Sequence, residues 1–582
     1  MRRSGLNLFK NAESSNENNN EAHFCASDGL GMEMTILGRI YRILQPYERK
    51  KGWRVIVTVL FSAVLDFMGL AALLPILYYL LDSGSNPKVA LQFCVLAISV
   101  ILFKSVLSVF FSRYQHKYLL SFYKRLSFSL YSSYYRRGLL FIREKGSNKL
   151  GYEVNAICLA FSQSLLAPMR RVLGDSLLIL LVTVALLIYD GKTVLLIYAT
   201  FLPFMVVYFL GVRKRIKKYG RLELDARREQ SRVVIDTFRG FTELEVSGAF
   251  PTLQAAFMEG MDKISHNRLK LDVIQKFPLF LSELSVIIGL TLLVAFGTGD
   301  VKMLIGVFAV AAFRLLPAMR GILSGWTQIQ NVSSYLDVIE EGLMEDASEG
   351  FSEANENLSF NQEISIKHLT YAYPDSFNVL ENFECNISKG EYIGFRGSSG
   401  VGKSTLFNLL IGLLIPSSGR ILIDGIPLSA ENRKAWMSHI GYVPQEVFIF
   451  NGTLAENIAL GCTYINKERI KDILNKVSLM NWVESLPDGL DAVLGEGGGK
   501  LSGGQKQRIG IARALYKEAD VLFLDEATSA LDNRTEKEVN ETLLDLKKSY
   551  QGLTILSIAH RESSLTYCDR IITLKNDEEQ NL

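Results

Sequence analysis

Two short motifs in the second half of the chain contain residues that could bind nucleotide phosphates. Residues 397–404 read Gly-Ser-Ser-Gly-Val-Gly-Lys-Ser, and Leu501-Ser-Gly-Gly-Gln505 follows downstream. In the first motif a glycine-rich turn would let backbone N–H groups close around phosphates, and the next helix would add its positive N-terminal end. Lys403 would reach the β- and γ-phosphates, and the Ser404 hydroxyl would bind Mg²⁺. This motif predicts an ATP and Mg²⁺ site made of Gly397, Ser398, Ser399, Gly400, Val401, Gly402, Lys403, Ser404 and Thr405.

Carboxylates and an amide complete the predicted site. The apolar run Val521-Leu-Phe-Leu is typical of a buried strand, and it ends in Asp525 and Glu526. Asp525 would hold Mg²⁺, and Glu526 would act as the general base on the attacking water. Gln445, in Tyr442-Val-Pro-Gln445, would contact both the Mg²⁺ ion and that water. Together these residues predict hydrolysis of the bound nucleotide.

Two aromatic residues near these motifs have a functional and a structural interpretation. His560 follows the apolar strand Thr554–Ala559 and would hydrogen-bond the γ-phosphate, although a lone histidine is often structural. Tyr373 precedes the phosphate loop and would stack on adenine, or would be an ordinary strand aromatic.

Composition divides the chain into a membrane half and a soluble half. The 582 residues exceed one hydrophobic core, and the long apolar runs are confined to the first half. We predict a disordered polar tail at 1–33, a membrane domain at 34–340, a linker at 341–360 and a nucleotide-binding domain at 361–582. The expected fold is an α-helical six-span transmembrane domain with long cytoplasmic helix extensions, followed by an α/β P-loop ATPase domain. Met1, Met32 and Met34 all remain possible natural starts.

Six apolar stretches are long enough to cross a bilayer, which takes about 20 helical residues. We place them at 54–81, 89–112, 166–189, 193–212, 277–297 and 301–323.

Charge distribution sets the expected orientation. Segments 113–149 and 211–232 each contain nine Lys or Arg, whereas the loops at 82–88, 190–192 and 298–302 contain one lysine each. By the positive-inside rule, both termini and the ATPase domain would be cytoplasmic, in what would be a bacterial inner membrane. The basic segments would turn near 134–142 and 239–247, and 34–50 would form an interfacial elbow helix.

Ionisable residues inside the predicted spans are candidates for contact with a transported molecule. They are Asp66, Lys104, Glu283 and Arg314. Charges in lipid are unfavourable unless they face a cavity or a partner. Counting the helical rise places Glu283 and Arg314 at similar depth, so Arg314 either pairs with Glu283 or meets an anionic group of the cargo.

The net charge and the cysteine spacing bear on whether the protein binds nucleic acid or a metal ion. A net charge of +3 does not suggest nucleic acid, and the six scattered cysteines have no metal-type spacing.

The nucleotide-binding half resembles the ATP-binding cassette (ABC) transporters. Its motifs match those of the family in order: Gly397–Ser404, Gln445, Leu501–Gln505, Asp525-Glu526, Ser529-Ala-Leu-Asp532 and His560. With six spans before a single cassette, the chain from about residue 34 resembles an exporter half-transporter. The resemblance implies a homodimer with two competent sites. In it Ser502 and Gly504 of one copy, with Gly503 and Gln505 of the same motif, close over the ATP held by Lys403 of the other.

The last predicted span, with Phe313-Arg-Leu-Leu-Pro317, looks most like bacterial flippases for lipid-linked oligosaccharides. That likeness implies ATP-driven outward movement of an amphipathic, anionic lipid by alternating access. A multidrug or peptide/bacteriocin exporter is the alternative, because arginines in a cavity do not identify a cargo. An ATP-gated channel or a regulator is a further alternative, which an intact Glu526 and His560 disfavour.

Overall fold

The computed structural model forms two compact units. One comprises Met1–Tyr135 with Ile142–Met344, and the other Arg136–Phe141 with Glu345–Leu582. The structure describes residues 36–72, 75–76, 87–189, 191–296, 301–332, 334–344, 357–374, 376–499, 501–527, 533–550, 552–559 and 561–574. The predicted tail at 1–33 therefore lies outside the described residues.

Among its described residues, the first unit consists of helices joined by short turns, without strands. Its helices are α2 (Ile36–Ile43), α3 (Pro46–Ala71), α5 (Pro87–Arg136), α6 (Gly138–Lys145, whose first residues belong to the other unit), α7 (Ser147–Tyr152), α8 (Cys158–Phe161), α9 (Ala167–Tyr189), α10 (Gly191–Arg239), α11 (Phe241–Ser247), α12 (Phe250–Phe296), α13 (Val301–Asn331) and α14 (Ser334–Leu343). Two π-helical segments, Glu153–Ile157 and Ser162–Leu166, flank α8.

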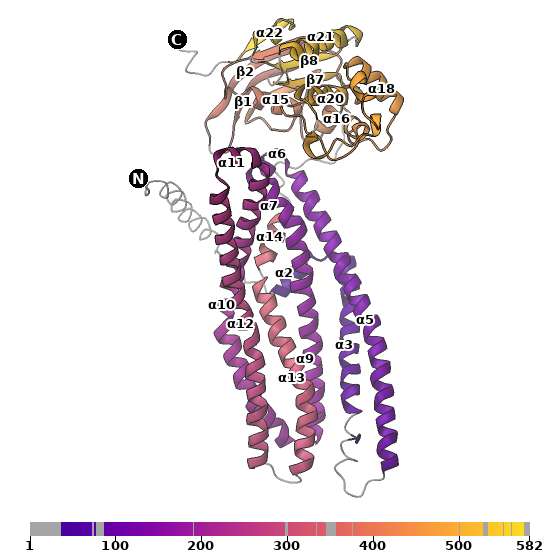
Figure 1. The fold of residues 1–582 in the computed structure, drawn as a ribbon, viewed down its shortest axis with the longest axis vertical. Coiled ribbons are helices and arrows are strands. Elements are labelled where there is room, and N and C mark those ends of the chain that lie inside the picture. The colour runs from indigo at the N-terminus through magenta and orange to yellow at the C-terminus, as the bar shows by residue number, and fades with distance from the viewer. Residues whose placement is uncertain are drawn as a thin grey trace, which may run out of the picture. The chain divides into compact units, whose positions relative to one another are not determined.

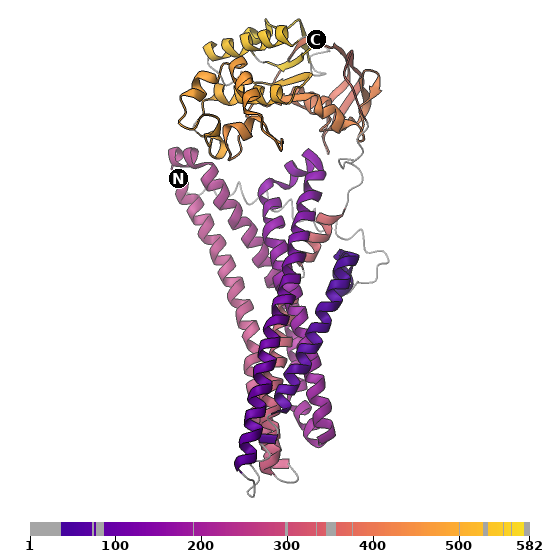
Figure 2. The ribbon, with the colours of Figure 1, turned by 90° about the vertical axis from the view of Figure 1, so that its right-hand side faces the viewer.

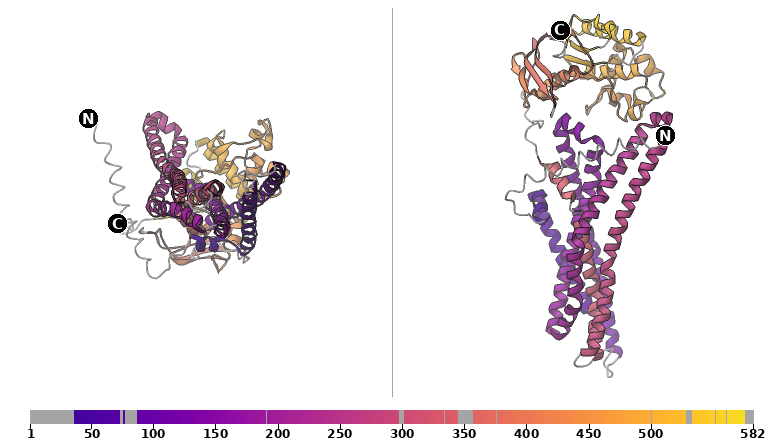
Figure 3. Two further views of the ribbon diagram at one scale, coloured as in Figure 1. Left: turned by 90° about the horizontal axis from the view of Figure 1, so that it is seen from below. Right: turned by 90° about the vertical axis from the view of Figure 1, so that its left-hand side faces the viewer.

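The long helices of this unit run in the same general direction, and α10 and α12 diverge from the other helices toward the end where α11 joins them (Figures 1 and 2). Helix α10 packs along α12, and α9 packs against both α3 and α13. Figure 3 shows the same helices from below and from a further side. Apolar residues of α3, α9 and α13 form a shared core, which includes Ala63, Leu178, Val182, Phe308 and Ala318.

The predicted membrane region is confirmed as a helical one. Within the described residues, three helical stretches are long and apolar enough to cross a membrane: Pro46–Ala71, Leu91–Arg136 and Ser147–Ile188. The other predicted spans, 193–212, 277–297 and 301–323, fall in α10, α12 and α13. The total of six spans stays a prediction, as does the end of the first span at 81, which lies outside the described residues.

The elbow helix predicted at 34–50 is wrong in its extent. Helix α2 ends at Ile43, and residues from Pro46 onward already belong to α3. The cause is Pro46, which holds Gln45 in an extended conformation (φ −69°, ψ 155°) and so separates the two helices. The buried Glu48 stabilises the new start, since its carboxylate accepts the Gln45 N–H at 3.1 Å and binds Arg125 of α5 at 2.6 Å.

The turns predicted within the two long basic segments are confirmed. Helix α5 ends at Arg136, and α10 ends at Arg239. The short helices α6 and α11 follow them, at the places where the chain reverses.

The second unit is an α/β domain, as predicted. Its strands are β1 (Glu363–Ala372), β2 (Asn378–Ser388), β3 (Tyr392–Arg396), β4 (Ser418–Ile423), β5 (Ile426–Pro427), β6 (Ile440–Val443), β7 (Val521–Asp525), β8 (Thr554–Ile558) and β9 (Arg570–Thr573). Its helices are α15 (Lys403–Ile411), α16 (Arg433–Ser438), α17 (Leu454–Ile458), α18 (Lys467–Lys476), α19 (Met480–Glu484), α20 (Gly503–Tyr516), α21 (Asn533–Ser549) and α22 (Glu562–Leu565), with 3₁₀ turns at Gly489–Asp491 and Glu496–Gly498.

A five-stranded parallel sheet organises this unit. Its strand order is β6-β7-β8-β3-β9, and a separate antiparallel sheet has the order β2-β1-β4-β5. In Figure 1 strands β7 and β8 lie between α21 and α22 on one side and α15 and α20 on the other. Burial on both faces explains why β7 and β8 read as continuous apolar runs instead of alternating ones.

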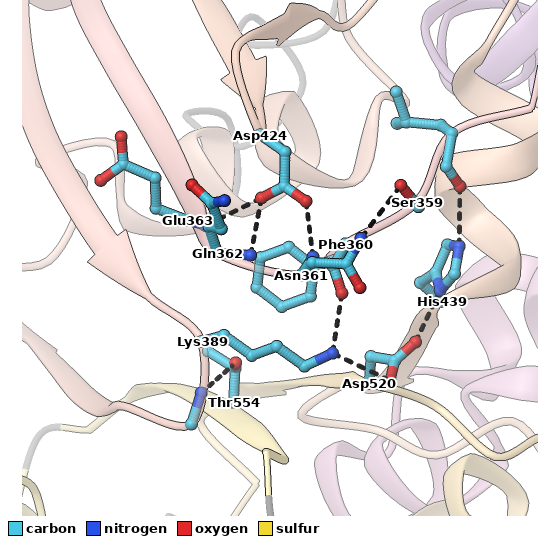
Figure 4. A network of polar contacts seen from close by, with 12 residues as sticks. Ser359, Phe360, Asn361, Gln362, Glu363, Lys389, Asp424, His439, Asp520 and Thr554 are labelled. Atoms are coloured by element: carbon cyan, nitrogen blue, oxygen red, sulfur yellow. Dashed lines mark hydrogen bonds and ion pairs between the residues drawn. The ribbon is translucent and has the colours of Figure 1, made fainter.

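The first residues of this unit are held to its sheets by a network of polar contacts (Figure 4). Asp424 accepts backbone N–H groups from Asn361 at 2.5 Å, Gln362 at 2.8 Å and Glu363 at 2.9 Å. On the other side Lys389 donates to the Phe360 carbonyl at 2.7 Å. The start of β1 is thus fixed by one carboxylate that satisfies three consecutive backbone donors.

His439 contacts the chain just before the start of β1. The His439 ring lies between the Asp520 carboxylate (2.6 Å from Nδ1) and the Leu358 carbonyl (2.9 Å from Nε2). Leu358 and Phe360 are buried in the core beside Trp436, whose ring meets that of Phe360 edge-on at 5.7 Å. Residues of the predicted linker from Leu358 onward are therefore part of this folded unit.

We expect Asp424→Asn to lower the melting temperature of the ATPase unit by about 2 to 4 °C, as the loss of one charge-assisted acceptor would. Asparagine tolerates the left-handed backbone at this position (φ 48°), so the substitution tests the charge and not the conformation. Thermal unfolding of the full chain in detergent, followed by tryptophan fluorescence, measures it. Asp491→Asn, at an exposed Lys467 pair, is the control; equal melting temperatures of the two variants would contradict this role.

The same variant carries a pH dependence with a defined sign. Burial alone would raise the pKa of Asp424, but hydrogen bonds from Glu363, Asn361 and Gln362 lower it overall. The stabilisation is therefore complete above the unfolded-state pKa of about 4 and is lost as pH falls through the lower folded-state pKa. The difference in melting temperature between wild type and Asp424→Asn should be constant from about pH 6 to 8 and should shrink in acid.

Candidate nucleotide site and membrane charge cluster

The phosphate loop connects strand β3 to helix α15. Gly402 begins the helix with a left-handed backbone (φ 98°), and Gly400 is left-handed too (φ 85°). A Cβ at Gly402 would lie 3.0 Å from the Val379 carbonyl oxygen, so only glycine fits this close approach. The predicted strand, loop and helix arrangement of Gly397–Ser404 is present, with backbone N–H groups of α15 free of intrahelical partners at its start.

Lys403 lies within this loop. Lys403 is buried, and its ammonium group donates to the carbonyls of Gly397 and Ser398, both at 2.9 Å. Burial lowers the pKa of Lys403, while the nearby Glu526 and Asp525 oppose that shift. A cation held inside a ring of backbone groups suits a phosphate group.

Asp525 and Ser404 meet at the carboxyl end of β7. The Ser404 hydroxyl donates to one Asp525 oxygen at 3.1 Å, and the Tyr442 hydroxyl donates to the other at 3.2 Å. Burial raises the pKa of Asp525, although both hydrogen bonds lower it. Two adjacent hard oxygen donors fit a Mg²⁺ ion. Sequence reasoning missed Tyr442, whose position on β6, paired with Phe523 of β7, is the available signal.

Glu526 has an unusual backbone. It directly follows β7 with φ 51°, and its N–H donates to the Ile558 carbonyl at 3.2 Å. A left-handed conformation at a non-glycine residue is strained and clusters at functional sites. The strand end and the turn together hold this carboxylate beside Asp525.

Gln445 is exposed, and its backbone is held by a residue that sequence reasoning missed. The buried Gln507 of α20 donates through Nε2 to the Gln445 carbonyl at 2.8 Å. This bond joins the loop of Gln445 to the helix that follows the Leu501–Gln505 motif. The signal in the sequence was only the closeness of Gln507 to that motif.

The motif Leu501–Gln505 forms the N-terminus of α20. The Ser502 hydroxyl accepts the Gln505 N–H at 3.2 Å, and the Gln505 side chain accepts the Ser502 N–H at 2.8 Å, which is a capping box. Ser502 and Gly503 are exposed, whereas Gly504 is buried. The exposed, positive end of a 14-residue helix can bind a phosphate, and here the Gln505 side chain acts as a helix cap.

Tyr373 lies directly after β1. Its hydroxyl is 3.1 Å from the Thr405 hydroxyl in the first turn of α15, and its ring meets Tyr371 edge-on. The structure therefore brings Tyr373 next to the phosphate-loop helix, and its stacking on adenine stays a prediction. His560 and Ser529–Asp532 lie outside the described residues.

The first unit contains a second cluster of predicted site residues. Asp66 of α3 pairs through one oxygen with Lys104 of α5 at 2.5 Å and with Arg314 of α13 at 2.6 Å. All three side chains are only partly exposed, and the Arg314 Nε has no hydrogen-bond partner among the described residues. Three of the four predicted membrane charges thus form one group with a formal charge of +1, since two cations share one carboxylate.

The fourth charge does not join them. The predicted alternative of a Glu283–Arg314 pair is wrong: Glu283 of α12 is exposed and lies 3.7 Å from Arg320. Residues 314 and 320 are six positions apart, so they point from different faces of α13, and counting the rise gives depth but not direction. The residue that Glu283 meets is therefore Arg320 of α13.

Sequence reasoning also missed Asp175 of α9. Gly321 of α13 leaves no room for a Cβ beside its carboxylate, and Asp175 interacts electrostatically with Arg171, Arg314 and Asp66. With Asp175 and Arg171 added to the group, it contains three cations and two carboxylates, so its formal charge is still +1. The run of apolar residues around Asp175 was the available signal.

Comparisons with known proteins show the family of this chain. The family model for ABC transporters matches residues 380–529. An ATP-dependent lipid A-core flippase of Ralstonia nicotianae is 30% identical over 448 residues, 74% of this chain and 73% of that protein. A flippase of the same name from Alkalilimnicola ehrlichii is 29% identical over 561 residues, 92% of this chain and 91% of that protein.

A solved structure has the same overall fold. A bacterial Atm1-family ABC exporter with ATP bound aligns with a TM-score of 0.75 and 20% identity, covering 90% of this chain and 93% of that one. The helical membrane unit, the phosphate loop and the carboxylates of β7 therefore belong to one architecture. The chain belongs to the ABC transporters, as a multi-pass membrane exporter whose ATPase domain binds ATP and couples its hydrolysis to transport.

Proposed function

We propose that this exporter is a homodimeric flippase that moves an amphipathic lipid with an anionic head group outward across the membrane. The observation that carries this proposal is the positive cluster of Asp66, Lys104 and Arg314 among membrane helices. The lipid class is supported by relatives named ATP-dependent lipid A-core flippase. A lipid-linked oligosaccharide, with its phosphate groups, is a second cargo of the same chemistry.

Each nucleotide site would use the groups described above. Lys403 and the N-terminus of α15 would bind the β- and γ-phosphates, and Tyr373 would stack on adenine. Ser404, Asp525 and Gln445 would hold Mg²⁺, which supplies charge neutralisation at the phosphates. Glu526 would take the proton of the attacking water, and His560 would hydrogen-bond the γ-phosphate.

Two copies would complete each site. The chain has one phosphate loop and one Leu501–Gln505 motif. The exposed N-terminus of α20, with Ser502 at its cap, offers a second phosphate-binding end to the partner's nucleotide. Closure of the pair would turn the cavity outward, and hydrolysis would reset it.

The unpartnered Nε of Arg314 favours a role in cargo binding. Asp66 engages the guanidinium through Nη2, while the buried Nε–H has no acceptor among the described residues. A phosphate oxygen could accept from it without breaking the pair with Asp66. The expected orientation, with both termini and the ATPase domain in the cytoplasm of a bacterium, would place cargo entry on the inner side.

Replacing Glu526 with Gln should leave ATP affinity within about threefold and lower turnover by about 100-fold or more, since shape is kept and the base is lost. Nucleotide binding and phosphate release in nanodiscs measure both quantities. Glu518→Gln is a matched control, because Glu518 is exposed and has a similar left-handed backbone (φ 60°). Turnover within a few-fold of wild type would reject Glu526 as the base.

Composite sites make a prediction for mixed dimers. A heterodimer of a Lys403→Ala chain and a Ser502→Arg chain keeps one intact site, so it should hydrolyse ATP at about half the wild-type rate. A heterodimer of wild type with the Lys403→Ala/Ser502→Arg chain has the same two changes but no intact site. Two affinity tags isolate each pair. Equal rates would contradict shared sites, and a closed Glu526→Gln dimer with ATP in native mass spectrometry provides an independent check.

For the cargo site, Arg314→Ala should abolish transport of a fluorescent anionic lipid in proteoliposomes, together with its stimulation of ATPase activity. Basal ATPase activity and melting temperature should change little, because Lys104 still neutralises Asp66. Arg320→Ala, beside the exposed Glu283, is the control. Wild-type transport by Arg314→Ala would reject the cargo site. Loss of transport of a neutral amphipathic drug instead of the lipid would favour a multidrug exporter.

A further inference from the structure

A buried carboxylate on α21 receives several hydrogen bonds from one short segment. Glu536 is 3% exposed, and its carboxylate accepts from Arg561 Nη1 at 2.7 Å, Ser563 Oγ at 2.9 Å and Ser564 Oγ at 2.5 Å. Ser564 is buried as well. A buried charge is stable only when its oxygens are supplied with donors, and here a single stretch of chain supplies them.

The segment that supplies these donors begins at the residue after His560. Arg561 also approaches Asn533, the first residue of α21, at 3.4 Å. On the other side of His560, the Ala559 N–H donates to the Phe395 carbonyl of β3 at 3.3 Å. The chain is therefore held both immediately before and immediately after His560, and Glu536 makes the hold on the later side.

We propose that Glu536 is a positioning residue for ATP hydrolysis, which fixes the segment after His560 against α21. Glu536 does not touch the nucleotide in this proposal; it acts through His560, and it thus rests on the γ-phosphate role proposed for that histidine. Helix α21 begins at Asn533, the residue that follows Ser529–Asp532 in the sequence. No part of the sequence motifs assigns Glu536 a role.

The charge of Glu536 is maintained by its donors. Burial alone would raise its pKa, but the hydrogen bonds from Ser564, Arg561 and Ser563 lower it overall. At neutral pH the group is a carboxylate, which accepts from all three donors. An amide in its place would turn an NH₂ group toward these donors and would lose part of the hold.

The test is a kinetic cycle on the full chain in nanodiscs. Glu536→Gln should lower kcat for ATP hydrolysis about tenfold or more while ATP affinity stays within about threefold, because binding groups are untouched. In a His560→Ala background the same change should have no further effect on kcat, since two residues that act as a unit are not additive. Glu541→Gln, on the same helix but exposed and 3.8 Å from Lys537, is the matched control and should hydrolyse ATP at the wild-type rate.

A merely structural role would give a different result. It would lower the melting temperature without a change in kcat at temperatures where the variant is folded, or it would slow His560→Ala as much as wild type; either result overturns the proposal. If Glu536→Gln does not fold, Ser564→Ala removes one donor, keeps the carboxylate, and should show the same cycle at smaller size. A His560→Ala protein that hydrolyses ATP at the wild-type rate would instead refute the role of His560 in the proposed function, and with it this proposal. If only the role of Glu536 is wrong, His560→Ala will still hydrolyse ATP slowly, while Glu536→Gln will keep the wild-type kcat.

Discussion

The parallel pairing of strands β6, β7, β8 and β3 is the constraint on which the nucleotide site depends. Parallel strands end at the same edge of a sheet, so the residues that follow them meet although they are far apart in the sequence. The phosphate loop follows β3, and Asp525 and Glu526 come at the end of β7. The hydrogen bond from Ser404 to Asp525 is the direct result, since it joins the loop after one strand to the end of another. Without this register the same residues would have no common site.

Carboxylates hold the chain at places where one helix or strand ends and the next begins. Glu48 fixes the start of α3 against α5, and Asp424 fixes the start of β1. Glu536 holds the segment after His560 against α21. In each case the donors are backbone N–H groups, hydroxyls or an arginine, so the negative charge is compensated locally.

The membrane unit meets a different electrostatic problem. Its helices are surrounded by apolar side chains, where an unpaired charge is strongly unfavourable. Asp66 forms ion pairs with both Lys104 and Arg314 and thereby links α3, α5 and α13. Because two cations share one carboxylate, the group keeps a formal excess of one positive charge.

Much of the local structure around the predicted nucleotide site could be read from the sequence, because it depends on residue type and spacing within single segments. The glycine-rich turn of 397–404 and the apolar strand that ends in Asp525 lie where they were predicted, since their local structure follows from backbone preferences. The turns predicted near 134–142 and 239–247 match the helix ends at Arg136 and Arg239. Pro46 ended the elbow helix earlier than the amphipathic pattern suggested, because a local steric effect outweighed that pattern.

The tertiary structure alone decided which distant side chains meet. Counting the helical rise predicts that Glu283 and Arg314 lie at the same depth. The direction in which each side chain points from its helix is different, however, so Arg314 pairs with Asp66 and Glu283 lies beside Arg320. The contacts of Tyr442, Gln507 and Asp175 with their distant neighbours form only when strands and helices from different parts of the chain pack together. A sequence states the types of groups and their spacing along one line, whereas the partner of each group depends on the rotation and register of elements that only the folded chain defines.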